Sequence, residues 1–123
     1  MINKYQLLIL FLAIFNGPLL AQSPQLTQKP LNFPNPFRAL DGTQIQYVLN
    51  QSATIELSVY NSHGRLIHRD YFLKGHLGGQ KDLNIVDLKQ TGFPFHSLSS
   101  GVYIYIIRAN QSVIGKGKMA VLS

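Results

Sequence analysis

Apolar and polar residues alternate along the chain from Gly42 onward, and this period of two residues most constrains the fold. Residues 43–49 place three large side chains on one face: Ile45, Tyr47 and Leu49. Residues 54–60 repeat the pattern, with Glu56 and Ser58 expected outward and with these three inward: Ile55, Leu57 and Val59. Successive side chains of a β-strand point to opposite faces, so the pattern predicts half-buried strands rather than helices.

Turn residues separate these segments from further strands. The run Asn-Ser-His-Gly at 61–64 predicts a hairpin whose second strand covers residues 65–73. A weaker strand is expected over 83–86, and residues 90–100 form the longest irregular stretch.

The most apolar stretch, residues 101–108, is expected to be a central strand that turns back through 109–112 into a last strand over 113–122. Around one core, the paired strands are expected to contain Tyr60, Arg65, Val102, Tyr103 and Ile106. Truncating Val102 or Ile106 is therefore expected to open a cavity.

About seven short strands separated by turns, with no convincing amphipathic helix after the first 21 residues, predict an all-β fold. The expected architecture is an immunoglobulin-like antiparallel β-sandwich over residues 31–123. The chain has no cysteine, so this domain must be held together by packing alone, without disulfides.

Residues 1–21 have the layout of a signal peptide. Lys4 precedes an apolar run at 7–15, and Asn-Gly-Pro then breaks the segment before Ala21. The run is shorter than the roughly 20 residues that a spanning helix needs. We expect cleavage after Ala21, a short linker over 22–30 and export of the mature chain, with no stable membrane span. An uncleaved membrane anchor is the alternative.

The net charge of +6 is spread over the chain. No run of five or more like charges occurs, so the sequence lacks the basic arm typical of nucleic-acid binding, and no nucleic-acid partner is expected. Solubility explains a basic surface, and mild attraction to anionic surface polysaccharide is an alternative.

The sequence shows no sign of catalysis or cofactor binding. Its four histidines are scattered at positions 63, 68, 76 and 96, which does not favour a metal site. No nucleophile motif of the Gly-x-Ser-x-Gly or Ser-x-x-Lys type occurs. The run Gly-Lys-Gly-Lys at 115–118 lies within a strand pattern and lacks the phosphate-binding spacing, so its glycines are expected at a bulge or an edge. We expect a non-enzymatic protein without metal or cofactor.

A proline-rich motif, Asn-Phe-Pro-Asn-Pro-Phe at 32–37, precedes the strands. Pro34 and Pro36 fix φ and favour extended conformations at the residues before them. The stiff segment is expected to carry the rings of Phe33 and Phe37 onto a hydrophobic surface. A plain proline-rich linker is the alternative.

Together these segments resemble the C-terminal (type A) sorting domain of the Bacteroidetes type IX secretion system, which is similar in turn to the immunoglobulin-like domain of flagellar hook-capping proteins. Residues 32–37 resemble the family's opening Tyr-Pro-Asn-Pro-Phe element, and 42–49 its first strand. Residues 58–67 resemble its Val-Tyr-Asp-x-x-Gly-Arg-x-Val hairpin, 99–105 its Ser-Gly-Val-Tyr-x-Tyr strand, and 116–123 its closing Lys-Met-Val-Leu strand.

The resemblance implies a module recognised after folding in the periplasm by the type IX apparatus, or assembled at the cell surface. Its partners would be secretion-apparatus proteins or cell-surface components. The chain matches the family's motifs at Asn32, Pro34, Asn35, Pro36, Phe37, Tyr60, Gly64, Arg65, Gly101, Val102, Tyr103, Lys116, Lys118 and Met119.

The chain departs from the family in three features. It has no tryptophan before the long loop, that loop carries the additional Phe93 and Phe95, and only residues 22–30 separate leader from domain. Such domains usually end a large cargo protein. A free-standing secreted module, a minimal substrate and a fragment of a longer protein therefore stay open. So does a structural or adhesive immunoglobulin-like module that binds protein or glycan through its loops.

The signal peptide gives the first prediction. The exported protein is expected to begin near Gln22, because the small Ala21 follows the break at Asn-Gly-Pro. Intact-mass analysis of the exported protein checks this. Recovery of the full-length chain from the inner membrane contradicts it.

Overall fold

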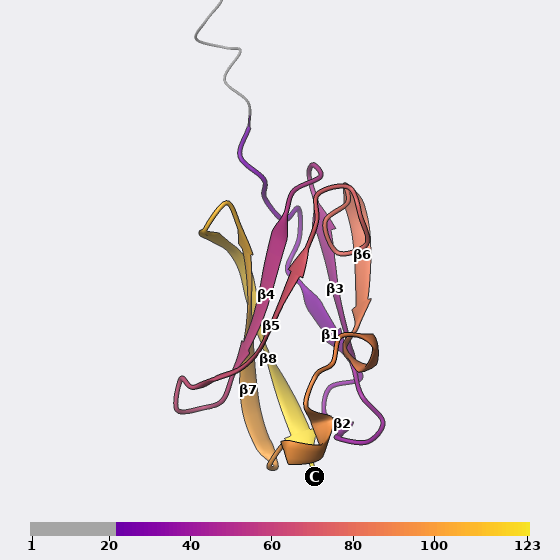
Figure 1. Cartoon of the computed structure of the whole chain (residues 1–123), viewed down its shortest axis with the longest axis vertical. Coiled ribbons are helices and arrows are strands. Elements are labelled where there is room, and N and C mark those ends of the chain that lie inside the picture. The colour runs from indigo at the N-terminus through magenta and orange to yellow at the C-terminus, as the bar shows by residue number, and fades with distance from the viewer. Residues whose placement is uncertain (1–21) are drawn as a thin grey trace, which may run out of the picture.

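The computed structural model describes residues 22–123, which form two β-sheets packed face to face (Figure 1). The predicted leader at 1–21 lies outside the described residues. The smaller sheet has the order β1-β3-β6, formed by Leu31–Phe33, Gln44–Leu49 and Asp82–Asp87. The larger has the order β2-β8-β7-β4-β5, formed by Phe37–Arg38, Ser112–Leu122, Gly101–Ala109, Ile55–Tyr60 and Leu66–Phe72.

Residues 22–123 contain no α-helix, which confirms the all-β prediction. Two 3-10 turns, η1 (Leu88–Gln90) and η2 (Phe95–Ser97), interrupt the long irregular stretch between β6 and β7. All strand pairs are antiparallel except β2 with β8. The segment 22–30, expected to be a linker, lies against β3, where the Thr27 amide donates to the Val48 carbonyl at 3.0 Å.

The alternation predicted for β3 and β4 is confirmed. The six side chains expected inward are all buried between the sheets: Ile45, Tyr47, Leu49, Ile55, Leu57 and Val59. Ser58, expected at the surface, is also fully buried. It lies on the outer face of the larger sheet between Arg69 of β5 and Ile106 of β7, which are its partners in register. Ser58 is buried because it is a small side chain between two long ones.

Strand β7 lies between β8 and β4, as its apolar sequence predicted. Its inward side chains are Tyr103, Tyr105, Ile107 and Ala109. The prediction that Val102 and Ile106 are core residues was therefore wrong: Val102 is 48% exposed, and Ile106 lies on the same outer face and is half-buried. Residues 102–107 are all aliphatic residues or tyrosines, with no charged side chain, so their alternation does not mark which set faces the core.

The two glycines of β8 have different roles. Gly117 pairs with Tyr105, and a side chain at this position would collide with the Tyr105 hydroxyl. Gly115 pairs with Ile107, while the next residue of β7, Arg108, pairs with Val113, so Ile114 is an extra residue. This is a β-bulge, as expected for this segment.

Buried polar groups anchor the connection between β5 and β6. The Tyr47 hydroxyl donates to the Gly78 carbonyl at 2.5 Å, and burial raises its pKa well above the usual value for tyrosine. The Asn84 side chain accepts from the Gly78 amide at 2.9 Å and donates to the Gln80 carbonyl at 2.8 Å. Both side chains are almost fully buried, and their hydrogen bonds hold the loop against the sandwich.

The orientation of β7 gives the second prediction. Ile107→Ala is expected to lower the free energy of unfolding by about 2–5 kcal/mol, because it leaves a cavity in the core. Val102→Ala, the matched control on the opposite face, is expected to cost less than about 1 kcal/mol. Urea denaturation of both variants measures the difference. Equal losses contradict this orientation of β7.

Candidate functional site

The opening motif at 32–37 and the closing strand β8 meet at one side of the larger sheet. The Asn35 side chain donates through Nδ2 to the Lys118 carbonyl at 3.1 Å, and its Oδ1 accepts from the Ala120 amide at 2.9 Å. An amide side chain thus takes the place of a neighbouring strand. Immediately afterwards, Phe37 and Arg38 pair in parallel with Val121 and Leu122.

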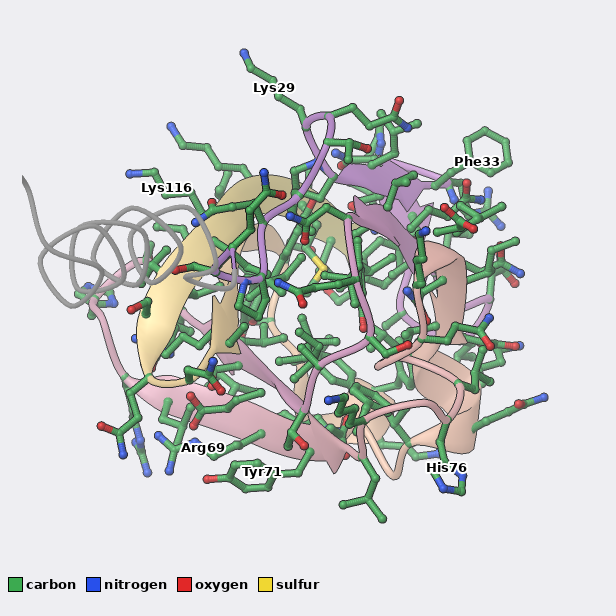
Figure 2. All side chains as sticks on the ribbon, turned by 90° about the horizontal axis from the view of Figure 1, so that it is seen from above. Lys29, Phe33, Arg69, Tyr71, His76 and Lys116 are labelled. Carbon is green, nitrogen blue, oxygen red and sulfur yellow. The ribbon has the colours of Figure 1, made fainter. Side chains whose placement is uncertain are left out.

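The two aromatic rings of the motif point in different directions. Phe37 is 2% exposed and packs edge-on against Phe95, with ring centroids 6.2 Å apart. Phe33 is 69% exposed and projects away from the sandwich (Figure 2). The prediction that both rings cover a hydrophobic surface is therefore right for Phe37 and wrong for Phe33. Phe33 pairs with Gln44, and the next residue of β3, Ile45, points into the core. Phe33 and Gln44 therefore lie on the opposite face, which points to solvent.

Thr43 fixes the first half of the motif to β3. Asn32 donates through Nδ2 to the Thr43 hydroxyl at 2.6 Å, and that hydroxyl donates to the Pro34 carbonyl at 2.8 Å. Thr43 is 3% exposed. Asn32 and Asn35 therefore have separate roles: the first fastens the motif to the smaller sheet, and the second fastens it to the larger sheet. A plain linker would not make these contacts.

The motif residues of β7 lie beside the closing strand. Gly101 pairs with Val121, Val102 with Ala120, and Tyr103 with Met119. The Tyr103 hydroxyl donates to the Ser99 carbonyl at 2.9 Å. Gly101 has a φ of 153°, a conformation that suits glycine best.

The C-terminal residue is held by a link that the sequence did not suggest. The Ser123 amide donates to the Ser100 hydroxyl at 2.9 Å. This contact joins the residue after β8 to the residue before β7, so the end of the closing strand is fixed on two sides.

The hairpin residues lie farther across the same sheet. The Asn61 side chain accepts from the amides of His63 at 3.0 Å and Arg65 at 2.9 Å, and Gly64 has a φ of 82°. These contacts stabilise the predicted turn, and they leave Arg65 exposed. Tyr60 lies on the outer face, where Ile104 separates it from Lys118.

A charged network covers this outer face. Glu56 accepts from Arg69 Nε at 2.8 Å and lies 3.6 Å from Arg108 Nη1. Arg108 also donates to the Tyr60 hydroxyl at 3.5 Å, and this hydrogen bond lowers the pKa of Tyr60. The only carboxylate of this face among the residues described is thus already shared by two arginines.

The two lysines of the closing strand are exposed on the same face. Lys116 pairs in register with Ile106, and Lys118 pairs with Ile104, while Met119 points inward and is 1% exposed. The four segments that contain the matched motif positions, 32–37, 60–65, 101–103 and 116–119, therefore all contribute to the larger sheet. The structure brings the opening motif, the β7 motif and the closing strand together, and it leaves Tyr60, Gly64 and Arg65 on the far side of β7.

A second pair of titratable side chains lies on the inward side of β5. His68 Nε2 lies 2.7 Å from Asp70 Oδ2, and its ring packs edge-on against Phe93 at 5.3 Å. Across residues 22–123, no group of three or more histidine, cysteine or acidic side chains is placed to hold a metal ion. In the same range, no helix is long and apolar enough to cross a membrane.

Comparison with known proteins supports the fold. No family model and no curated protein matches the chain. An immunoglobulin-like protein from Pseudomonas aeruginosa is similar in structure, with a TM-score of 0.53 and 10% identity over 84% of this chain and 99% of that one. The Pseudomonas fluorescens alkylpurine DNA glycosylase AlkC, solved bound to DNA containing an abasic site analog, matches with a TM-score of 0.55 and 10% identity over 86% of this chain. The match spans 32% of that enzyme. At this identity, the matches establish an immunoglobulin-like β-sandwich.

The Asn35 contacts give the third prediction. Asn35→Ala removes both hydrogen bonds to β8 and is expected to lower the free energy of unfolding by about 1–2 kcal/mol. It should also speed hydrogen exchange at the Ala120 amide. Asn35→Asp, which keeps the acceptor for that amide, serves as the control and is expected to preserve more of its protection. Unchanged exchange in Asn35→Ala contradicts the role of this side chain.

Proposed function

We propose that this chain is a non-enzymatic, exported immunoglobulin-like module that the type IX secretion apparatus recognises through its folded closing strand. It passes through the periplasm and acts at the cell surface. The placement of residues 116–123 supports the proposal most. Met119 and Val121 anchor the strand in the core, while Lys116 and Lys118 stay exposed to a partner.

Recognition after folding requires that the signal be displayed by the native structure. The closing strand pairs with β7 along one edge, and on its other edge it contacts the Asn35 side chain and β2. The spacing of the two exposed lysines is set by the folded strand. A partner that binds both lysines at this spacing therefore binds only a chain whose larger sheet is complete. This favours a folded epitope over a linear tag.

Protection of the sheet edge is the competing explanation for the two lysines. Charged side chains on an edge strand hinder unwanted pairing between sheets. A structural or adhesive module would need Lys116 and Lys118 for this purpose alone. Transport and stability must therefore be measured on the same variants.

The fourth prediction separates these explanations. In a host with the type IX apparatus, a reporter fused ahead of Leu31 is expected to reach the cell surface. The same fusion with Lys116→Gln and Lys118→Gln is expected to stay in the periplasm. The double variant should lose only about 0–1 kcal/mol of stability, because exposed charges contribute little.

Lys74→Gln with Lys81→Gln is the matched control, since it removes the same charge from exposed lysines outside β8. Surface delivery of all three fusions would mean that the closing lysines serve only edge protection. Retention of the wild-type fusion would mean that the chain shares the fold of sorting domains without their function.

A further inference from the structure

Strand β8 has an open edge along part of its length. On one side it pairs with β7 from Ser112 to Val121, but on the other side β2 pairs only with Val121 and Leu122. Asn35 occupies the Lys118 carbonyl and the Ala120 amide on that second side. Beyond Asn35, towards Ser112, no described strand pairs with this edge.

The contacts of Asn35 show which backbone groups face outward. The amides and carbonyls of successive residues in a strand point to opposite edges, so Lys116 has the same orientation as Lys118 and Ala120. The amide and carbonyl of Lys116 and the amide of Lys118 therefore face the open edge. Among residues 22–123, no backbone or side-chain partner is recorded for these three groups on that edge.

Residues 22–30, which precede β1, cover the core next to this edge but do not pair with β8. A Cβ at Gly115 would collide with the Leu26 side chain and would lie 3.6 Å from Pro30. The same segment contains Lys29, which is exposed and, like Lys116, projects outward from the sandwich (Figure 2).

The charge at the edge is of one sign. Lys29, Lys116 and Lys118 lie on the segments that form it, and none of the five aspartate and glutamate side chains belongs to residues 22–40 or to β7 or β8. Glu56, on the adjacent β4, is already paired with Arg69 and Arg108. A second copy of β8 would bring lysines opposite lysines, which disfavours self-pairing.

The opposite edge of the larger sheet is less suited to pairing. Strand β5 carries His68 and Asp70 on its inward side, 2.7 Å apart, and charged residues that point inward are a common protection of edge strands. Its outward Arg69 is held by Glu56. The edge of β8 instead combines free backbone groups with unpaired lysines.

We propose that the open edge of β8 binds an extended, acidic peptide segment of another protein by β-strand addition. Backbone hydrogen bonds form with Lys116 and Lys118, and acidic side chains on alternate positions of the peptide lie beside the two lysine side chains. The added strand continues the edge that β2 and Asn35 begin. The binding does not depend on the proposed role in sorting, because it involves only the purified chain and a peptide.

The test uses a fluorescein-labelled decapeptide that alternates glutamate and threonine. Fluorescence anisotropy is expected to show saturable binding with a Kd below about 1 mM. Lys116→Gln with Lys118→Gln is expected to weaken binding about tenfold, since two cross-strand charge pairs are lost. Lys74→Gln with Lys81→Gln, which has the same net charge, should stay within about twofold of wild type.

Two further measurements distinguish strand addition from simple charge attraction. Methylation of alternate backbone nitrogens of the peptide should abolish binding, because it removes the donors that pair with β8. Hydrogen exchange should show protection of the Lys116 and Lys118 amides in the complex. The proposal is overturned by any of four results: no saturable binding, equal loss in both double variants, unchanged binding of the methylated peptide, or protection of β5 instead. Self-association through β8 in sedimentation would likewise identify a second copy as the occupant.

Discussion

The pairing of β7 with β8 on one side and β4 on the other is the interaction on which the rest of the structure depends. It brings the inward residues Tyr103, Tyr105 and Ile107 against the smaller sheet, and it fixes which side chains of β8 face solvent. Burial of large side chains is the main stabilising term in a domain that has no disulfide. The exposure of Lys116 and Lys118 is thus a consequence of how β7 packs.

Segments with clear alternation could be predicted from sequence. β3 and β4 have polar residues between apolar ones, so the buried face of each was evident, and the glycine and asparagine turns predicted the hairpins. β7 lacks such a contrast, and its orientation depends on Gly117 leaving room for Tyr105 across the strand pair. Because this contact is between residues of two strands, it produces no pattern within the sequence of β7 itself. The same applies to Phe33, whose direction follows from its register with β3.

The candidate site was predictable in its parts but not in its geometry. The motifs identified the opening segment and the closing strand, yet the role of Asn35 depends on partners 83 and 85 residues away. An asparagine between two prolines indicates a turn, and its hydrogen bonds to a distant strand become evident only in the folded chain. The Phe37–Phe95 contact likewise joins the opening motif to the irregular stretch.

The parallel pairing of β2 with the end of β8 also limits when the larger sheet can be completed during synthesis. Phe37 and Arg38 have Val121 and Leu122 as their strand partners, so β2 cannot join the larger sheet before residues 121–122 have been synthesised. Contacts between residues so far apart in sequence form slowly, because the entropic cost of closing the long loop between them must be overcome first. A nascent or truncated chain therefore has an incomplete larger sheet. The position of β2 in the folded domain therefore depends on residues 121–122.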